Sequence, residues 1–126
     1  VTSDKRDKTD ISDFVHGLDY VNQLNPVNFK WDMRSLYRGA DGKPTKEPDG
    51  THKEDQSQLG LLAQDILAVE KSLGIEDSDN SIVDSSRPES LKVVESRLAY
   101  VLINAVKELS AKVDVLENRV VLLENK

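Results

Sequence analysis

The sequence has no cysteine, few aromatic residues and no long apolar run. Without cysteine the chain cannot form a disulfide, a zinc–thiolate site or a thiol nucleophile. Because the longest apolar runs are only a few residues, we expect no membrane-spanning helix and no membrane partner. The compact core should be modest, since the aromatic residues are limited to Phe14, Tyr20, Phe29, Trp31, Tyr37 and Tyr100.

Charge and length narrow further the class of protein to which the chain can belong. The 126 residues carry 17 Lys and Arg against 23 Asp and Glu, which gives a net charge of −6. No basic stripe gathers the positive residues, so we expect no nucleic-acid partner. The length suits one domain, or a small domain with an appended helix. Because the sequence starts at Val1 without an initiator Met, we expect a fragment of a longer protein.

Residues that could hold a metal ion or a cofactor are scarce. His16 and His52 lie far apart in different kinds of segment, and His16 and Asp19 are expected to be solvated surface residues. The stretch 41–50 lacks the alternating oxygen ligands and terminal Glu of a calcium loop. There is no Gly-rich phosphate loop and no Gly-x-Ser-x-Gly nucleophile motif. We therefore expect no metal and no cofactor.

The N-terminal half predicts an arm followed by a helix and a strand. Residues 1–10 are nearly all polar or charged and should form the arm. Apolar residues at helical spacing predict a helix over 11–24, which Asn25-Pro26 would end. Alternation of apolar and polar residues over 27–31 predicts a half-buried strand. The stretch 39–57 is rich in Gly, Pro and charge, and predicts a long surface hairpin or loop.

The middle of the chain predicts a second helix and two short strands. The helix should run from about 62 to 73, with Gly74 in the left-handed position that ends it. The acidic stretch 76–88 predicts a loop with one short strand at Ile82-Val83, and 91–94 predicts another strand. The residues expected to pack in the head are Val27, Phe29, Trp31, Leu61, Leu62, Ile66 and Val69.

The C-terminal third carries a heptad repeat, with valine at position a and leucine at position d. Positively charged residues at g, Lys112 and Arg119, precede glutamates at the following e positions, which is the sign pattern of interchain ion pairs. Each exposed pair contributes only about 0–1 kcal/mol, so these pairs select the partner and the register. The residues expected to line the oligomer interface are Leu102, Val106, Leu109, Val113, Leu116, Val120 and Leu123.

A lone helix would leave this apolar seam in water, so the segment predicts an oligomer. The alternative is a long helix packed back on its own domain. Valine at a with leucine at d leans toward two strands in model coiled coils, although the head domain can dictate another symmetry. The expected fold is α+β: a small mixed head of short strands and helices, followed by a long C-terminal helix that forms a coiled coil. The expected domain boundaries are 1–10 for the arm, 11–96 for the head and 97–126 for the helix.

The arm holds the best candidates for chemistry. A serine hydroxyl is a poor nucleophile until a base removes its proton, and a neutral lysine can be that base. Ser3 and Lys8 could form such a dyad, while Lys5 and Arg6 add positive charge that favours the neutral form of Lys8. Taken alone, a serine near a lysine in a charged arm is in most cases part of a solvated tail.

Four segments, in this order, resemble the peptidase S74 family, the C-terminal intramolecular chaperones of the endosialidase type found in phage tail spikes, tail fibres and neck appendages. The resemblance covers essentially the whole chain. The segments are Ser3-Asp4-Lys5-Arg6-Asp7-Lys8, Leu24-Asn25-Pro26-Val27-Asn28-Phe29-Lys30-Trp31, Gly60-Leu61-Leu62-Ala63-Gln64-Asp65, and the helical stretch 100–109.

The resemblance implies a homotrimeric chaperone that assembles an upstream fibre or spike domain of the same polypeptide and is then released by self-cleavage. The scissile bond would be Thr2-Ser3, with Ser3 as the nucleophile and Lys8 as its base. Asp4 and Arg6 match family positions and would support the site. The activity would be that of a single-turnover autoproteolytic serine peptidase. It would act in the host cell cytoplasm during phage assembly, and the domain would be released from the mature virion protein.

Two other functions stay open at this point. The first is a coiled-coil oligomerisation module of a fibrous protein, with the same seam but an inert Ser3. The second is a self-releasing domain of a membrane-tethered transcription factor, a context in which the same domain type occurs. That context requires a membrane span after the domain, and none follows within these residues.

Overall fold

The computed structural model describes residues 1–45, 47–76 and 78–126. Lys46 and Asp77, which belong to the two expected loops 39–57 and 76–88, lie outside the described residues. The chain divides into two compact units. The first combines residues 1–23 with 94–126, and the second consists of residues 24–93. The domain boundaries expected from the sequence, after residue 10 and after residue 96, stay a prediction.

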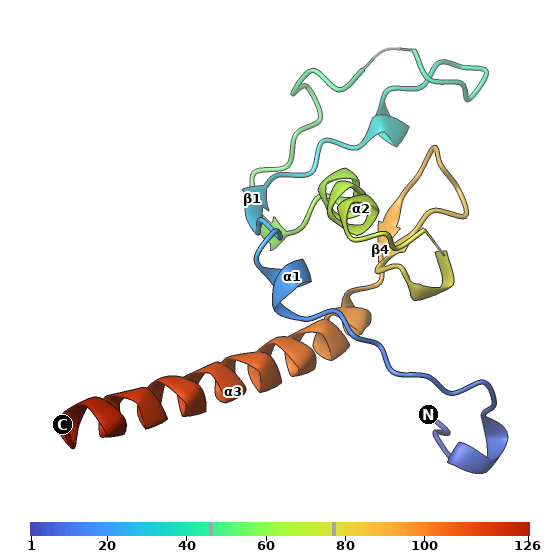
Figure 1. Cartoon of the computed structure of the whole chain (residues 1–126). Helices are drawn as coiled ribbons and strands as arrows, with labels where there is room; N and C mark the ends of the chain where they lie inside the picture. The colour runs from blue at the N-terminus through green and yellow to red at the C-terminus, as the bar shows by residue number, and fades with distance from the viewer. Residues whose placement is uncertain (46, 77) are drawn as a thin grey trace. The chain divides into compact units, whose positions relative to one another are not determined.

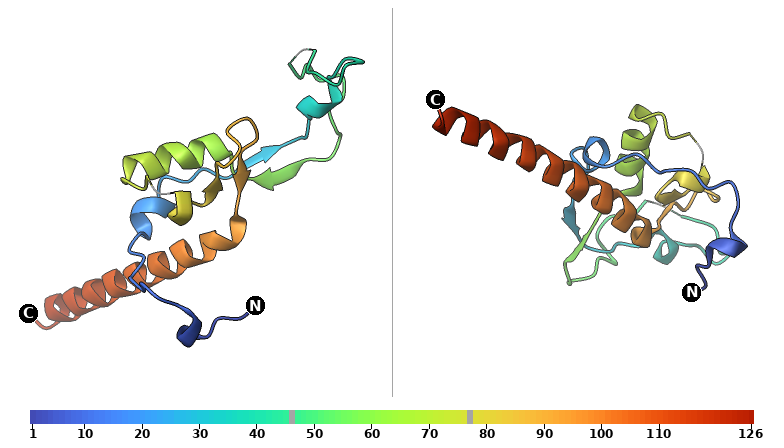
Figure 2. Two further views of the ribbon diagram at one scale, coloured as in Figure 1. Left: turned by 90° about the vertical axis from the view of Figure 1, so that its right-hand side faces the viewer. Right: turned by 60° about the horizontal axis from the view of Figure 1, so that its bottom comes forward.

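The first unit is built on one long helix, α3 (Leu98–Glu124), which follows the short 3₁₀ turn η4 (Glu95–Arg97). Its sequence contains neither glycine nor proline, so nothing interrupts the hydrogen-bonding ladder over 27 residues. Figure 2 shows α3 as one continuous helix. The prediction of a long C-terminal helix is confirmed.

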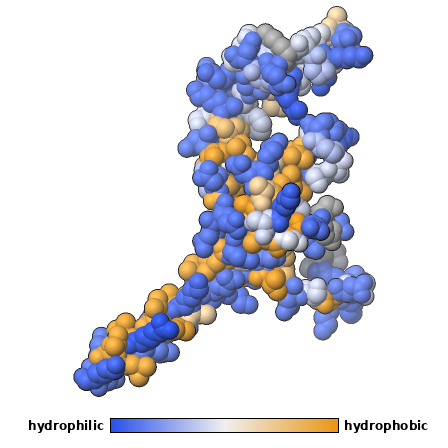
Figure 3. Space-filling model, turned by 45° about the horizontal axis from the view of Figure 1, so that its top comes forward, coloured by the Kyte–Doolittle hydropathy of each residue, from blue (hydrophilic) through white to orange (hydrophobic). Residues whose placement is uncertain are grey.

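The heptad seam of α3 is open to solvent in the single chain. The seven seam residues are each 47–65% exposed, and every residue over 109–126 is exposed. In Figure 3 hydrophobic residues (orange) are interspersed with hydrophilic ones (blue) along this part of α3. The residues that are buried on α3, Val101 and Ala105, lie near its N-terminal end and outside positions a and d.

The N-terminal part of this unit contains less helix than its sequence predicts. It forms a 3₁₀ turn, η1 (Lys5–Asp7), and one helical turn, α1 (Leu18–Val21), which packs against α3. Residues 11–16 have no helical structure, so the expected helix over 11–24 is wrong. Gly17 stands before α1 and contributes poor helix propensity. The backbone on either side of Gly17 instead bonds to side chains of α3.

The second unit contains a two-stranded antiparallel ribbon. Strand β1 (Val27–Phe29) pairs with β2 (Gln58–Gly60), with Asn28 opposite Leu59 (Figure 1). The connection between them holds a 3₁₀ turn, η2 (Arg34–Leu36), which confirms a strand followed by a long hairpin connection. Trp31 was expected in the core but is 46% exposed, because the ribbon ends before it, and it packs edge-on against Phe29.

The long connection is ordered by one buried tyrosine. The Tyr37 hydroxyl donates to Asp32 Oδ1 over 2.6 Å and accepts from the His52 N–H over 3.0 Å. Asp32 Oδ2 accepts from the Gly50 N–H over 2.9 Å. Burial and the bond to Asp32 raise the pKa of Tyr37. The two ends of the connection are therefore held together by side-chain hydrogen bonds.

A helix and a second ribbon complete this unit. Helix α2 (Ala63–Ser72) is followed by Gly74 at φ 75°, as predicted, then by η3 (Ser78–Asn80). Strand β3 (Val83–Asp84) pairs antiparallel with β4 (Lys92–Val93). The buried apolar residues of the unit are Tyr37, Ile66, Val69, Ile82 and Val83. Leu62 was expected among them but is 47% exposed, since it precedes the first turn of α2.

One buried carboxylate joins α2 to the segment before β3. Glu70 is 1% exposed and accepts hydrogen bonds from the Ser81 hydroxyl at 2.5 Å and the Ile82 N–H at 2.9 Å. A buried polar group is tolerated when hydrogen bonds of this kind replace its hydration. Glu70 therefore fixes residues 81–82 against α2.

Candidate functional site

The arm folds into a tight turn that brings Ser3 and Lys8 together. Asp4 caps η1, its carbonyl accepts from the Asp7 N–H at 3.1 Å, and the Lys8 N–H donates to the Lys5 carbonyl at 3.2 Å. One turn of this kind reverses the chain, so the Lys8 side chain points back along it. The Lys8 Nζ lies 2.7 Å from the Ser3 Oγ. This is the distance at which a proton can pass between a hydroxyl and an amine.

Asp4 and Arg6 form a second pair within the same turn. Arg6 Nη2 lies 2.7 Å from Asp4 Oδ2, and its Nε lies 3.0 Å from Asp4 Oδ1. The Arg6 backbone N–H also donates to Asp4 Oδ1 at 2.9 Å. The Arg6 guanidinium and backbone N–H lower the pKa of Asp4, and the same pairing raises the pKa of Arg6. Since both carboxylate oxygens bond to Arg6, the Asp4 charge is directed toward Arg6.

The bond before Ser3 is open to solvent. Thr2, Ser3 and Lys8 are all exposed, and Asp4 is half-buried. Water can therefore reach the Thr2 carbonyl. Chemically, the arrangement offers a hydroxyl, an amine within hydrogen-bonding distance of it, and a peptide carbonyl directly before the hydroxyl. The structure brings together all five residues that the sequence assigns to the site, while their catalytic roles stay a prediction.

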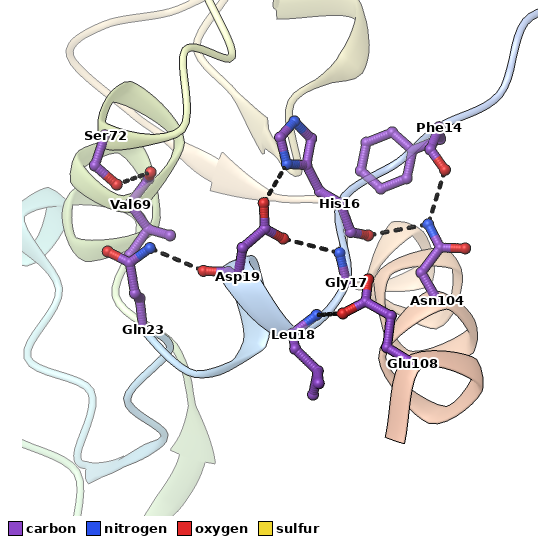
Figure 4. Close-up of polar contacts among 10 residues, drawn as sticks. All are labelled: Phe14, His16, Gly17, Leu18, Asp19, Gln23, Val69, Ser72, Asn104 and Glu108. Atoms are coloured by element: carbon purple, nitrogen blue, oxygen red, sulfur yellow. Dashed lines mark hydrogen bonds and ion pairs between the residues drawn. The ribbon is translucent and has the colours of Figure 1, made fainter. Parts of the chain in front are cut away.

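The segment that follows the arm is attached to α3 by two side chains (Figure 4). Asn104 Nδ2 donates to the Phe14 carbonyl at 2.8 Å and to the His16 carbonyl at 3.0 Å. Glu108 Oε2 accepts from the Leu18 N–H at 3.1 Å. We call this arrangement of Asn104 and Glu108 on residues 14–18 the α3 clamp.

Gly17 allows this close approach. A Cβ at Gly17 would lie 2.8 Å from the Ala105 nitrogen and 2.9 Å from the Asn104 carbonyl carbon, both of them backbone atoms of α3. Distances below 3 Å cannot be relieved by a side-chain movement when the neighbour is backbone. Only glycine fits here, so the chain runs in direct contact with the helix.

His16 and Asp19 form a side-chain contact that the sequence does not predict. His16 Nδ1 lies 2.8 Å from Asp19 Oδ2, and the Gly17 N–H donates to Asp19 Oδ1 at 2.9 Å. The bond to His16, supported by the Gly17 N–H, lowers the pKa of Asp19. Both residues were expected to be solvated, and His16 is in fact half-buried. The usable signal was the acidic residue in the first turn after Gly17, a common position for a carboxylate near the N-terminus of a helix.

Neither a metal centre nor a membrane segment is found among the described residues. In the ranges 1–45, 47–76 and 78–126, no three His, Cys, Asp or Glu side chains gather in a way that could hold an ion. Within the same ranges, no helix combines the length and the apolar composition needed to cross a membrane.

The comparison with protein families shows which family the chain belongs to. Residues 3–75 match the family described as chaperone of endosialidase, peptidase S74. The chain belongs to this family. The match spans more than half of the chain and includes Ser3, Lys8 and the Asp4–Arg6 pair. Neither the curated proteins nor the solved structures gave a match to the chain.

Membership identifies the chain as a chaperone domain of the peptidase S74 family. The family name also points to a peptidase-related activity and to an upstream endosialidase-like domain as the partner. Helix α3 lies outside the matched range. Its resemblance to the closing helix of the family therefore rests on residues 100–109 of the sequence.

Proposed function

We propose that this chaperone domain trimerises and folds an upstream phage fibre, spike or appendage protein, and then releases itself by cleaving the Thr2-Ser3 bond. The observation that carries the proposal is the 2.7 Å approach of the Lys8 Nζ to the Ser3 Oγ within the family match. In this scheme the domain acts in the host cell cytoplasm during assembly and leaves the mature virion protein.

The cleavage proceeds in two steps, the formation of an ester and its hydrolysis. Neutral Lys8 takes the proton of the Ser3 hydroxyl, and Oγ attacks the carbonyl carbon of Thr2. The Thr2–Ser3 C–N bond then breaks, and Lys8 returns the proton to the Ser3 nitrogen, which leaves an ester between Thr2 and Ser3 Oγ. Water hydrolyses this ester, so that Thr2 ends one product as a carboxylate and Ser3 begins the other with a free amine. Each chain performs the reaction once.

Asp4 and Arg6 support this chemistry by positioning. Their ion pair closes the turn between Ser3 and Lys8. It also directs the Asp4 carboxylate to Arg6, whereas a carboxylate facing Lys8 would favour the protonated amine that cannot act as a base. The positive charge of Lys5 next to the site works in the same direction.

Assembly relies on the exposed seam of α3. Burying the leucine and valine side chains of the seam in a coiled coil removes apolar surface from water, which stabilises the assembly by about 25 cal/mol per Å² buried. Three parallel chains would hold the upstream segments in register while their slow, non-local β-pairing completes. Completion would then shape the cleavage site, and release would leave a fibre trapped by its unfolding barrier.

The alternative is an oligomerisation module that does not cleave. It uses the same seam, and it is favoured by the exposure of Thr2, Ser3 and Lys8, because an arm this open to solvent lacks the exclusion of water that is typical of an active site. The two functions differ only in the covalent fate of the Thr2-Ser3 bond, so a mass measurement separates them.

The test is the intact mass of the domain expressed behind its native upstream segment, in the wild type and in Ser3→Ala. We expect a wild-type fragment that begins at Ser3 and an uncut Ser3→Ala chain. The matched control is Ser12→Ala, another exposed serine of the same unit, which should cleave like the wild type. If wild type stays whole while the fibre still assembles, the domain is an oligomerisation module.

A further inference from the structure

We propose that Asn104 and Glu108 are positioning residues for cleavage, through which the assembly of α3 is transmitted to the Ser3–Lys8 site. The inference rests on the proposed function and adds to it the residues that connect its two parts. Neither side chain is bonded to Ser3 or Lys8 in the structure; both act through the backbone of residues 14–18.

The clamp fixes three backbone groups of a segment that has no regular structure of its own. Residues 14–16 are neither helix nor strand, so their carbonyl groups need partners from elsewhere. Asn104 supplies both of its amide hydrogens, to Phe14 and to His16, and Glu108 receives the Leu18 N–H. Asn104 and Glu108 are half-buried, so these bonds are partly shielded from water. The clamp therefore fixes the path of the chain across one face of α3.

That face is opposite the seam. In the heptad defined by Val106 at a and Leu109 at d, Asn104 occupies f and Glu108 occupies c. Position f points directly away from the a/d seam on a helix with 3.6 residues per turn. A coiled coil can thus form along the seam while the clamp holds residues 14–18 on the other side. Both contacts coexist on the same helix, and each benefits from a rigid, aligned α3.

The clamp lies close to the active pair along the chain. Six residue steps separate Lys8 from Phe14, which limits their Cα–Cα distance to about 20 Å. Asp10 adopts φ 54°, so the intervening chain turns rather than extends. Fixing residues 14–18 on α3 therefore confines the arm, and alignment of three α3 helices would confine three arms in the same way. Small errors in the placement of reacting groups cost large factors in rate.

The first experiment compares two identical substitutions on α3. Asn104→Asp removes both donated bonds and sets a carboxylate against the Phe14 and His16 carbonyls. Asn118→Asp makes the same change two heptads later, also at position f, where the side chain is exposed. In the assembled protein with its native upstream segment, we expect Asn104→Asp to slow cleavage by about ten- to a hundredfold. Asn118→Asp should leave the rate unchanged.

Two milder variants guard against a simple folding defect. Asn104→Ala removes the donors without adding a repulsive charge and should slow cleavage less. Glu108→Gln keeps a side-chain oxygen for the Leu18 N–H and should cleave nearly as fast as the wild type, whereas Glu108→Leu should not. For these Asn104 and Glu108 variants, rates are measured only on material whose oligomer mass and thermal midpoint match the wild type, so a loss of folding cannot mimic a loss of positioning.

A double-mutant cycle tests the transmission itself. The seam change Leu109→Asp with Leu116→Asp should slow cleavage by at least about tenfold in the wild type, but by no more than about threefold when Asn104→Asp is already present. The inference would be overturned if the seam change and Asn104→Asp slowed cleavage independently, so that their factors multiplied in the combined variant. It would also be overturned if the Asn104→Asp variant cleaved at the wild-type rate. If the wild type itself does not cleave, the proposed self-release is wrong and so is the inference that rests on it. This outcome is distinct from the two above, in which the wild type cleaves and only the inference is wrong.

Discussion

The Lys8 Nζ lies 2.7 Å from the Ser3 Oγ, although the two residues are five positions apart in the chain. The approach depends on the turn η1, because the Lys8 N–H bond to Lys5 and the Asp4 cap fold the arm back on itself. A serine and a lysine held in this way by local bonds need no third element to meet. Each single chain can therefore form the site, and assembly would affect how precisely Ser3 and Lys8 are placed.

Replacing Lys8 by arginine tests its role as a base. Arginine keeps the positive charge but does not lose its proton in proteins, so it cannot accept the proton of the Ser3 hydroxyl. We expect Lys8→Arg to slow cleavage at Thr2-Ser3 by at least about a hundredfold, the usual contribution of a general base. The measurement is the fraction of cut chain over time by mass spectrometry, with Lys5→Arg as the matched control. Cleavage of Lys8→Arg at the wild-type rate would remove Lys8 from the mechanism.

The exposed seam gives a prediction about assembly. Leu109→Asp combined with Leu116→Asp places two carboxylates at d positions, where every chain of the oligomer would bring its own like charges together. We expect the oligomer to dissociate to monomers in multi-angle light scattering, and soluble upstream fibre to be lost with it.

The control for this change carries the same number of new charges on the opposite side of α3. Ala111→Asp with Asn118→Asp places them at successive f positions, both exposed, and should leave the oligomer intact. A soluble trimeric fibre from the seam variant would contradict the chaperone mechanism. Equal dissociation of both variants would mean that added charge, rather than the seam, weakens the assembly.

The features that the sequence predicts correctly depend on local patterns. Helix α3 follows from its heptads, α2 from its apolar spacing, and the end of α2 from Gly74 at φ 75°. The proximity of Ser3 and Lys8 is local in the same sense, since a short turn decides it. Periodicity and turn chemistry act over a few residues, so one sequence contains enough information for them.

The features that it misses depend on distant partners. The helix expected over 11–24 fails because the carbonyls of Phe14 and His16 bond to Asn104, about ninety positions away in the sequence. Asn104 is at an outward heptad position, where an asparagine is normally a solvated residue. Similarly, Trp31 continues the strand alternation but lies beyond the last ribbon pair. Periodicity alone cannot reveal such long-range contacts.

The buried Glu70 should be important for the stability of the second unit. Glu70→Ala removes the acceptor of the Ile82 N–H and one acceptor of the Ser81 hydroxyl in a site closed to water. We expect a loss of roughly 2–5 kcal/mol in the free energy of unfolding, measured by urea denaturation. Glu70→Gln keeps one carbonyl oxygen and should lose less. Lys71→Ala, the exposed neighbour on α2, should change stability by no more than about 0.5 kcal/mol. A Glu70→Ala variant as stable as Lys71→Ala would show that the buried bonds contribute little.

The pair formed by His16 and Asp19 predicts how stability depends on acid. The bond from His16 lowers the pKa of Asp19 in the folded chain, so the folded state favours the ionised carboxylate more than the unfolded state does. This contribution is complete above the unfolded pKa of about 3.9 and is lost as the pH falls through the lower folded value.

The matching experiment is thermal unfolding of the wild type and of Asp19→Asn from neutral pH to about pH 2, through the unfolded carboxyl pKa of about 3.9. At neutral pH we expect a lower melting temperature for Asp19→Asn, since the amide lacks the charged carboxylate that contacts His16 Nδ1 near the start of α1. The difference should begin to shrink near pH 3.9, where the carboxyl of the unfolded chain takes up its proton, and should be lost only below the lowered pKa of the folded carboxyl. Asp13→Asn, a change of an exposed carboxylate in the same unit, should leave the melting curve nearly unaltered. A difference between wild type and Asp19→Asn that stays constant down to the lowest pH would mean that the ionised carboxylate is not what stabilises this turn, and that Asp19 acts there only as an uncharged hydrogen-bond acceptor for Gly17.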